Sequence, residues 1–358
     1  MGATYKNNIE LTIFGESHGK AIGITIGNLP SGIQIDLDEV ARDMKRRAPG
    51  QNKMSTARKE ADQVEILSGL QDGITTGAPL TGVIYNSDQH SKDYSLLKTN
   101  MRPGHSDYPA YIKYKGFNDV RGGGHFSGRI TAPIVFAGNI AKQILKQKGI
   151  VIGAHIQSIK DVYDDSFGVD ISSQDIENML QQQYPTLNSH VFEKMQATIE
   201  EARINCDSVG GMIECAILNV PAGIGNPFFD SIESHLSPLL FSIPAVKSVS
   251  FGLGEKITEL YGHEANDCYY YDDEKVKTKT NHNGGITGGI SNGMPIIFRV
   301  GIKPTPSISQ VQQTVNIKTK ENTELEIIGR HDPCIVPRAV VVVESMAALG
   351  ILDMMKDI

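Results

Sequence analysis

The sequence predicts an α+β protein in which strands and helices follow one another in mixed order. Apolar residues at helical spacing alternate with short apolar runs, without the regular βαβ repeat of a doubly wound sheet. No proline- or serine-rich linker divides the 358 residues, so we expect one large domain over residues 1–358. Apolar residues make up 40% of the chain and charged residues 21%, which provides for both a core and a polar surface.

The first part of the chain is predicted to form strands, one capped helix and then a long helix. Residues 9–14 form a strand that runs into a turn at Gly15, and residues 20–27 form the next strand. The helix over 36–47 is capped by Asp36 or Asp38 and ends at Pro49-Gly50. Residues 64–67 and 80–85 are short strands. After polar, glycine-rich connections over 86–129, apolar residues at helical spacing predict a helix over 130–147.

The second part continues the mixed order of strands and helices. Strands are predicted over 149–158, 211–220 and 293–302, and helices over 177–183, 191–203, 231–240 and 339–355. Residues 314–327 suggest a hairpin that turns near Glu321-Asn322.

The charge balance and the cysteines exclude several classes of protein. The net charge of −7 and the absence of tryptophan argue against a protein that binds nucleic acid. The four cysteines form no C-x-x-C pair, which is typical of reduced thiols and not of a zinc site. Neither a signal peptide nor an apolar run of membrane-spanning length is present. We therefore expect a soluble cytoplasmic protein without a nucleic-acid or membrane partner.

Two loops, over 102–108 and 121–129, combine arginine, glycine and histidine. Arginine presents a planar cation that fits phosphate and carboxylate, glycines let backbone amides approach an anion, and histidine exchanges a proton near neutral pH. The pattern predicts a site for a multiply anionic small molecule that gains or loses a proton. Because few acidic residues stand among the arginines, we expect no metal there. The candidates are Arg102, His105, Arg121, His125, Ser127 and Arg129.

The segment Gly15-Glu-Ser-His-Gly19 presents Ser17 and His18 on what we expect to be an exposed turn. The G-x-S-x-G spacing also occurs in hydrolase elbows, but those need a helix after the turn, and here a strand is predicted. A hairpin with incidental polar residues is the remaining alternative.

Three further segments carry cations or glycines. The run Lys45-Arg46-Arg47 ends the first helix, either as a solvated helix end or, with Lys53, as an anion clamp. Residues 281–293 are rich in glycine, and Lys303-Pro-Thr-Pro-Ser307 follows them. Residues 329–334 bring Arg330, His331 and Asp332 onto one turn before a proline, for which internal pairing is the alternative.

Together these segments resemble the chorismate synthase family. The motifs GESHG, RPGH-x-D, RGGG-x-x-S-x-R, NH-x-GGI-x-GGIS-x-G, KPT-x-S and GRHDPC follow in that family's order and span residues 15–334. The resemblance implies a β-α-β sandwich with antiparallel sheets, assembled as a homotetramer. It also implies conversion of 5-enolpyruvylshikimate 3-phosphate to chorismate, a 1,4-elimination of phosphate that requires reduced FMN without net redox change.

By matching positions, the resemblance also implies the roles of individual residues. His18, with Ser17 beside it, would protonate the departing phosphate; His105 would donate to the reduced flavin; Asp332 would take part in removing the ring hydrogen; and Ser127 would lie near the substrate. The implied counter-charges of the substrate are Arg47, Lys53, Arg102, Arg129 and Arg330. The implied FMN contacts are His125, Phe126, Ser127, Pro244, Ala245, Gly288, Lys303, Pro304, Thr305, Pro306, Ser307 and Arg330.

The chain departs from the family pattern at three places. Lys53 stands where many relatives have arginine, His125-Phe126 replaces Arg-Ser of another subgroup, and Pro244 replaces an asparagine. These differences concern individual phosphate and flavin contacts and leave the reaction that the resemblance implies unchanged.

Two other functions are compatible with the residues. Another FMN-dependent enzyme that acts on a phosphorylated metabolite is the first, and a non-catalytic anion-binding protein is the second. The source of electrons for the flavin also stays open, because some family members use NADPH themselves. Since the chain has no large insertion relative to the compact form, external reduction is favoured.

Overall fold

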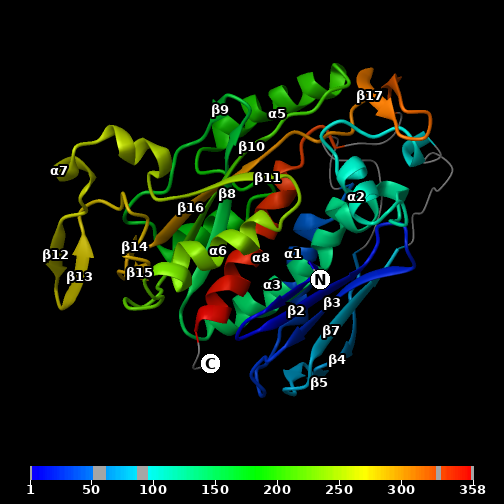
Figure 1. Ribbon diagram of the computed structural model, residues 1–358. Coiled ribbons are helices and arrows are strands. Elements are labelled where there is room, and N and C mark those ends of the chain that lie inside the picture. The colour runs from blue at the N-terminus through cyan, green and yellow to red at the C-terminus, as the bar shows by residue number, and fades with distance from the viewer. Residues whose placement is uncertain (1, 51–61, 87–95, 328–331, 356–358) are drawn as a thin grey trace. The chain divides into compact units, whose positions relative to one another are not determined.

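The computed structural model describes residues 2–50, 62–86, 96–327 and 332–355 (Figure 1). The chain forms two compact units, each assembled from separate stretches. Unit 1 comprises Met1–Phe136, Gln196–Gly210 and Pro304–Ile335, and unit 2 comprises Ala137–Met195, Gly211–Lys303 and Val336–Ile358. Two of the boundaries fall inside helices, so no linker divides the units along the sequence, and one domain over 1–358 stays a prediction.

Unit 1 is built on a sheet of five strands in the order β1-β2-β3-β7-β4. Ile22, Ile24 and Ile26 alternate along β3 and are fully buried, as expected for a strand with one face on a core. The strands pair antiparallel. Their bounds are β1 Thr4–Lys6, β2 Glu10–Gly15, β3 Ala21–Gly27, β4 Glu65–Ser68 and β7 Leu80–Tyr85.

Helix α1 (Leu37–Arg47) begins where predicted, because the Asp36 side chain accepts hydrogen bonds from the Asp38 and Glu39 amides. The polar connection over 86–129 was not expected to contain a helix, yet it includes α2 (Asp107–Lys113) and the 3₁₀ turns η2 (Leu96–Lys98), η3 (Arg121–Phe126) and η4 (Gly128–Ile130). The small hairpin of β5 (Leu70–Gln71) and β6 (Ile74–Thr75) follows β4.

The hairpin of β17 (Gln312–Asn316) and β18 (Glu321–Leu325) completes unit 1. The prediction that it turns near Glu321-Asn322 is wrong. The turn lies at residues 317–320, where Lys320 takes a φ of +62° and both Lys318 and Thr319 donate backbone N–H groups to the Asn316 side chain. This local capping by asparagine sets the register.

Unit 2 contains a second antiparallel five-stranded sheet, in the order β11-β16-β10-β8-β9. Every residue of β8 from Ile152 to Ile159 is buried, because helix α8 packs on one face and α4 on the other. The bounds of the strands are β8 Val151–Ile159, β9 Val162–Tyr163, β10 Gly211–Leu218, β11 Val246–Phe251 and β16 Ile296–Ile302. The α+β class and the antiparallel sheets are confirmed.

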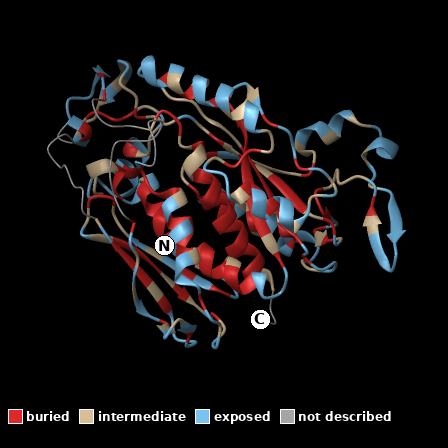
Figure 2. Cartoon of the chain, turned by 180° about the vertical axis from the view of Figure 1, so that it is seen from behind, coloured by how far each residue is buried: buried red, intermediate tan, exposed pale blue. Residues whose placement is uncertain are grey.

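Helix α8 (Val336–Met354), the red helix of Figure 1, is buried along almost its whole length. Figure 2 shows such buried stretches in red along strands and helices, with exposed residues in pale blue. The helix begins three residues earlier than predicted, since Pro337 is tolerated in a first helical turn. Helix α6 (Ile232–Phe241) packs against α8, and the Ser231 side chain caps its start.

Helix α4 (Ser173–Leu180) begins earlier than the predicted 177–183, because Ser172 and Asp175 form a reciprocal capping box that the periodicity did not reveal. The helices predicted over 130–147 and 191–203 are α3 (Thr131–Lys146) and α5 (Ser189–Ile204). The remaining elements of unit 2 are η5 Phe228–Asp230, η6 Gly254–Glu259, α7 Gly262–Ala265, β12 Tyr269–Asp272, β13 Lys275–Thr278, β14 Ile286–Thr287 and β15 Ile290–Ser291.

Unit 2 also buries a group of charges. The imidazole of His155 lies between Glu214, 3.0 Å from Nε2, and Asp164, 3.2 Å from Nδ1, while Arg299 lies 2.7 Å from the other oxygen of Glu214. Burial opposes the charged imidazole, but the two carboxylates outweigh it and raise the pKa of His155. The charges are thus paired within unit 2, as buried ions require.

No helix among the described residues is long and apolar enough to cross a membrane.

Gly138 on α3 lets α8 approach closely within unit 2. A Cβ atom on Gly138 would lie 2.1 Å from the Cβ of Ser345. We therefore expect Gly138→Ala to lower the free energy of unfolding by about 1–3 kcal/mol through overpacking, although alanine has the higher helix propensity. Urea unfolding followed by circular dichroism measures this change.

Gly262→Ala is the matched control, because Gly262 lies in helix α7 and a Cβ there would meet nothing within 4 Å. This control should change stability by no more than about 0.5 kcal/mol. Equal effects of the two substitutions would contradict the close approach of α3 and α8.

Candidate active site

The turn between β2 and β3 depends on a backbone geometry that glycine permits. Gly15 ends β2 with a φ of +93°, and a Cβ atom on it would lie 2.2 Å from the carbonyl oxygen of Ala21, where β3 begins. Because the strands on both sides are antiparallel neighbours, this is a strand-to-strand turn. A hydrolase elbow, which needs a helix after the turn, is therefore excluded.

Ser17 and His18 lie on this turn, and the prediction that they are exposed is wrong. Only 3% of Ser17 and 2% of His18 is accessible, because a loop from residues 121–124 covers them. The Ser17 hydroxyl donates to the carbonyl oxygens of Arg121 and Gly122, at 3.1 and 3.2 Å. Its oxygen lies 3.1 Å from Nδ1 of His18. When the hydroxyl proton is directed to these carbonyl groups, Nδ1–H of His18 donates to the hydroxyl oxygen; in the other tautomer the hydroxyl donates to Nδ1.

The covering segment, Gly122-Gly123-Gly124, is called the glycine loop below. Its three residues have φ angles of +55°, +88° and +55°, a region that other residues rarely adopt. A Cβ atom on Gly122 would lie 2.1 Å from the His18 ring, and one on Gly123 would lie 3.3 Å from Nε2 of His105. The bare backbone of this loop therefore touches both histidines.

Two further hydrogen bonds join the glycine loop to the turn. The Ser17 amide donates to the carbonyl oxygen of Gly124 at 3.1 Å. Nδ1 of His125 lies 2.8 Å from the carbonyl oxygen of Gly15 and donates to it. The GESHG motif and the RGGG-x-x-S-x-R motif thus form one hydrogen-bonded structure.

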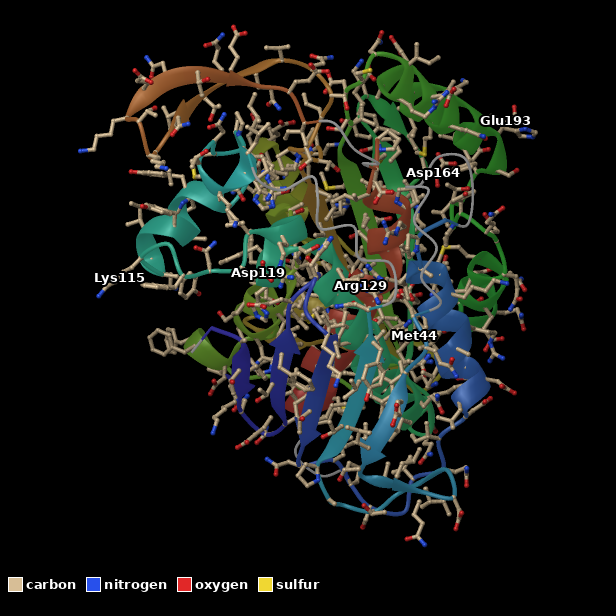
Figure 3. All side chains as sticks on the ribbon, turned by 90° about the vertical axis from the view of Figure 1, so that its right-hand side faces the viewer. Met44, Lys115, Asp119, Arg129, Asp164 and Glu193 are labelled. Carbon is tan, nitrogen blue, oxygen red and sulfur yellow. The ribbon has the colours of Figure 1, made fainter. Side chains whose placement is uncertain are left out.

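A chain of polar contacts connects the same turn to two buried arginines. The Asn86 amide group donates to the carbonyl oxygens of Glu16 and Gly19, at 3.1 and 2.8 Å, and its oxygen accepts from Nε of Arg129 at 3.2 Å. Arg129, labelled in Figure 3, also pairs with Asp62. The second oxygen of Asp62 accepts from Arg47 at 2.5 Å.

Asp62 is the common partner of both arginines, and its side chain is fully buried. Burial alone would raise the pKa of Asp62, but the charges and hydrogen bonds of Arg47 and Arg129 outweigh it and lower the pKa below its ordinary value. Arg47 is therefore not a solvated helix end, because its side chain is only 3% exposed.

A second group of charges surrounds His105. Asp107, the first residue of α2, accepts two side-chain hydrogen bonds from Arg102, both at 2.7 Å, and lies 2.6 Å from Nδ1 of His105. Arg102 also donates to the hydroxyl of Ser307 at 3.3 Å. Burial opposes ionisation of Asp107, but the hydrogen bonds from Arg102 and His105 hold the pKa of Asp107 well below its usual range.

The segment that contains Ser307 offers an unsatisfied polar atom. The hydroxyl oxygen of Thr305 is buried and has no hydrogen-bond partner among the described residues. An unpaired buried polar atom costs about 1–3 kcal/mol, so a bound group that reaches this hydroxyl would recover that cost. In unit 2, Ala245 accepts a hydrogen bond from the backbone N–H of Lys303 at 3.0 Å, which brings two predicted residues together.

The structure brings most of the predicted catalytic residues of unit 1 to the glycine loop. Ser17, His18 and His105 contact it, and the Cβ of Ser127 lies 3.6 Å from the place of a Cβ on Gly123. Arg121 pairs with Asp119, which Figure 3 labels. Asp332 is half-buried, while Lys53, Arg330 and His331 lie outside the described residues.

Four supporting residues were not predicted from the sequence: Asp62, Asn86, Asp107 and Asp119. Asp107 had a local signal, because it stands two residues after His105 in one of the two arginine-, glycine- and histidine-containing loops. Asn86 and Asp62 had no such signal, since each finds its partners far along the chain.

Comparisons with known proteins point to one family. The family model described as chorismate synthase matches residues 9–356. Among curated proteins, the chain is 47% identical over 348 residues to a chorismate synthase of Pyrococcus abyssi, with 96% of this chain and 95% of that protein covered. It is 44% identical over 362 residues to one of Methanocaldococcus jannaschii, with 98% and 96% covered.

A solved structure shares the fold. The structure titled "Crystal Structure of Chorismate Synthase" superimposes with a TM-score of 0.76 at 26% sequence identity, covering 98% of this chain and 92% of that chain.

Gly122→Ala should disturb His18 directly. The added methyl would overlap the imidazole, and the φ of +55° would be strained, so we expect stability to fall by about 1–3 kcal/mol and the His18 ring signals to shift in NMR spectra. Gly128→Ala is the control, because Gly128 lies in the same segment and a Cβ there would meet nothing within 4 Å. An unshifted His18 signal in Gly122→Ala would contradict the contact.

Asp62→Asn should destabilise the protein in a pH-dependent way. Breaking a buried ion pair costs about 3–5 kcal/mol, so we expect that loss at pH 7 in urea unfolding. Because folding lowers the pKa of Asp62, its contribution is complete above the ordinary value of 3.8 and is lost as the pH falls through the folded value. The difference between wild type and variant should therefore shrink below pH 3.8.

Asp72→Asn provides the control for this substitution. Asp72 has a φ of +50°, close to the +47° of Asp62, but it is exposed. It should change stability by no more than about 0.5 kcal/mol at any of these pH values. A constant difference for Asp62→Asn across the acid range would contradict the lowered pKa.

Proposed function

The chain belongs to the chorismate synthase family of carbon–oxygen lyases, and we propose that it converts 5-enolpyruvylshikimate 3-phosphate to chorismate. In this reaction a C–O bond to phosphate and a ring C–H bond break, and a new C=C bond forms. One observation carries the proposal: two histidines, His18 and His105, meet the bare backbone of the glycine loop, with paired arginines in the same unit. Such a site suits an anionic substrate that undergoes proton transfer.

Reduced FMN is the proposed cofactor, and the residues present fit it. The hydroxyl of Thr305, which has no hydrogen-bond partner among the described residues, and the glycine loop beside His105 and Ser127 offer polar and bare backbone surfaces. When bound, reduced FMN would supply electron density to the substrate and recover it, so that no net redox change results. His125, Phe126, Ser127, Thr305 and Ser307 would hold it in unit 1. For Pro244, Ala245, Gly288, Lys303, Pro304, Pro306 and Arg330 the assignment rests on the resemblance.

The chain's own side chains would move the protons. His18 would give the proton of Nε2 to the departing phosphate, while its Nδ1 stays bonded to the hydroxyl of Ser17. Asp332 would take part in removing the ring hydrogen. Arg47, Arg129 and Arg102 would add positive charge to the substrate site with Lys53 and Arg330, and their pairing with Asp62 and Asp107 would fix their orientation.

Three further properties belong to the same proposal. We propose that the flavin is reduced from outside the chain, with NADPH-dependent reduction by the chain itself as the alternative. We also propose a homotetramer and a cytoplasmic location, both from the resemblance to the family.

His18→Ala tests the proposed acid. We expect turnover to fall at least ~10²-fold, the range for a lost general acid, with FMN binding largely intact. The assay is anaerobic incubation with 5-enolpyruvylshikimate 3-phosphate and photoreduced FMN, followed by phosphate release. His190→Ala is the control, because His190 is exposed at the start of α5.

Wild-type turnover in His18→Ala would remove His18 from the mechanism. Consumption of one reductant per phosphate released would favour another FMN-dependent enzyme of phosphorylated metabolites. Repeating the assay with NADPH and oxidised FMN decides whether the chain reduces its own flavin.

A further inference from the structure

Both carboxylate oxygens of Asp107 accept hydrogen bonds. Oδ2 accepts from the backbone N–H of Arg102 at 3.1 Å and from its Nε at 2.7 Å. Oδ1 accepts from Nη2 of Arg102 at 2.7 Å and lies 2.6 Å from Nδ1 of His105. An ionised carboxylate has about four acceptor positions, and these four contacts use them.

This arrangement decides where the His105 ring carries a proton. The lowered pKa of Asp107 keeps the group a carboxylate, which can accept hydrogen bonds but not donate them. A nitrogen at 2.6 Å from such an oxygen must therefore be an N–H. Nδ1 of His105 is protonated, and a second proton on the ring can only be at Nε2.

The Nε2 edge of His105 faces the glycine loop. A Cβ atom on Gly123 would lie 3.3 Å from Nε2 and 3.6 Å from the Cβ of Ser127. The ring is mostly buried, with a side-chain exposure of 15%. Among the described residues, the ion pairs at this ring are with Asp107 and, behind that carboxylate, Arg102. Arg102 in turn reaches Ser307, so one guanidinium fixes both Asp107 and a residue of the proposed FMN segment.

We propose that Asp107, held by hydrogen bonds from Arg102, is a positioning residue that retains a proton on Nδ1 of His105 and directs Nε2 to the ligand. With its second proton the ring would meet reduced FMN as a cation. This inference rests on the proposed function, and it goes further by giving Arg102 a role in holding Asp107. The same logic governs the carboxylate–histidine pair of serine proteases, where the amide variant selects the wrong tautomer.

Asp107→Asn separates this role from simple packing. The two Arg102 donors at Oδ2 favour the amide oxygen there, which leaves the NH₂ group facing Nδ1 of His105 and Nη2 of Arg102, so that Nη2 loses this acceptor. Nδ1 must then accept, so the neutral ring carries its proton on Nε2 and cannot hold both protons in this position. The shape of the side chain is almost unchanged.

The direct measurement is the ring ¹⁵N shifts of His105 in flavin-free protein labelled at its ten histidines, with the signal assigned through His105→Gln. Wild type should show an N–H at Nδ1 at every pH, and Asp107→Asn should show a bare Nδ1. Asp119→Asn is the control, because Asp119 bonds to Arg121 and should leave the His105 signal unchanged. If Asp107→Asn does not fold, the wild-type spectrum still decides.

The second measurement compares binding of reduced and oxidised FMN. In Asp107→Asn the affinity for reduced FMN should fall at least ~10-fold relative to oxidised FMN, because the cation is lost, which corresponds to about 1.4 kcal/mol. A bare Nδ1 in wild type, an unchanged tautomer in the variant, or an unchanged affinity ratio each overturns the inference. The proposed reaction has its own test, because it is contradicted if wild type releases no phosphate. The ¹⁵N measurement of the tautomer does not depend on turnover, so the two outcomes are distinguishable.

Discussion

The close contact of the glycine loop with two histidines is the constraint on which the candidate site depends. The backbone at Gly122 and Gly123 lies so close to His18 and His105 that a side chain on either glycine would crowd these imidazole rings. The carbonyl group of Gly122, with that of the preceding Arg121, accepts the hydroxyl proton of Ser17, whose oxygen also contacts Nδ1 of His18. A loop without side chains therefore sets the chemistry of its neighbours through shape and hydrogen bonding.

Carboxylates orient the cations around this loop. Asp62 holds Arg47 and Arg129, Asp107 holds Arg102, and Asp119 holds Arg121. A buried guanidinium without a partner would be costly, and a long side chain without contacts would be disordered. Pairing removes both problems. If the proposed anion binds here, it would meet donors that are already in position, which would lower the reorganisation required.

The sequence alone allowed prediction of the fold class, the long helices and the segments of the site, since apolar periodicity and short motifs are local signals. It did not locate α2, in which Ala110 is the one buried apolar residue, nor the start of α4, which depends on a capping box. The burial of Ser17 and His18 was also out of reach, because it depends on residues more than 100 positions away. Asp62, the partner of Arg47 and Arg129, was also out of reach, because it stands 15 and 67 positions from them. Asp107 and Asp119 are different, since their bonds to Arg102 and Arg121 are local.

The order of the elements along the chain has a consequence for synthesis on the ribosome. The sheet of unit 1 is complete once β7 has emerged, so its strands can pair early. The sheet of unit 2 has its strands β8 and β10 packed against α8, the last described element of the chain. Until that helix leaves the exit tunnel, apolar strands such as β8 lack their cover on one face, and a nascent chain at this stage exposes apolar surface to which chaperones bind.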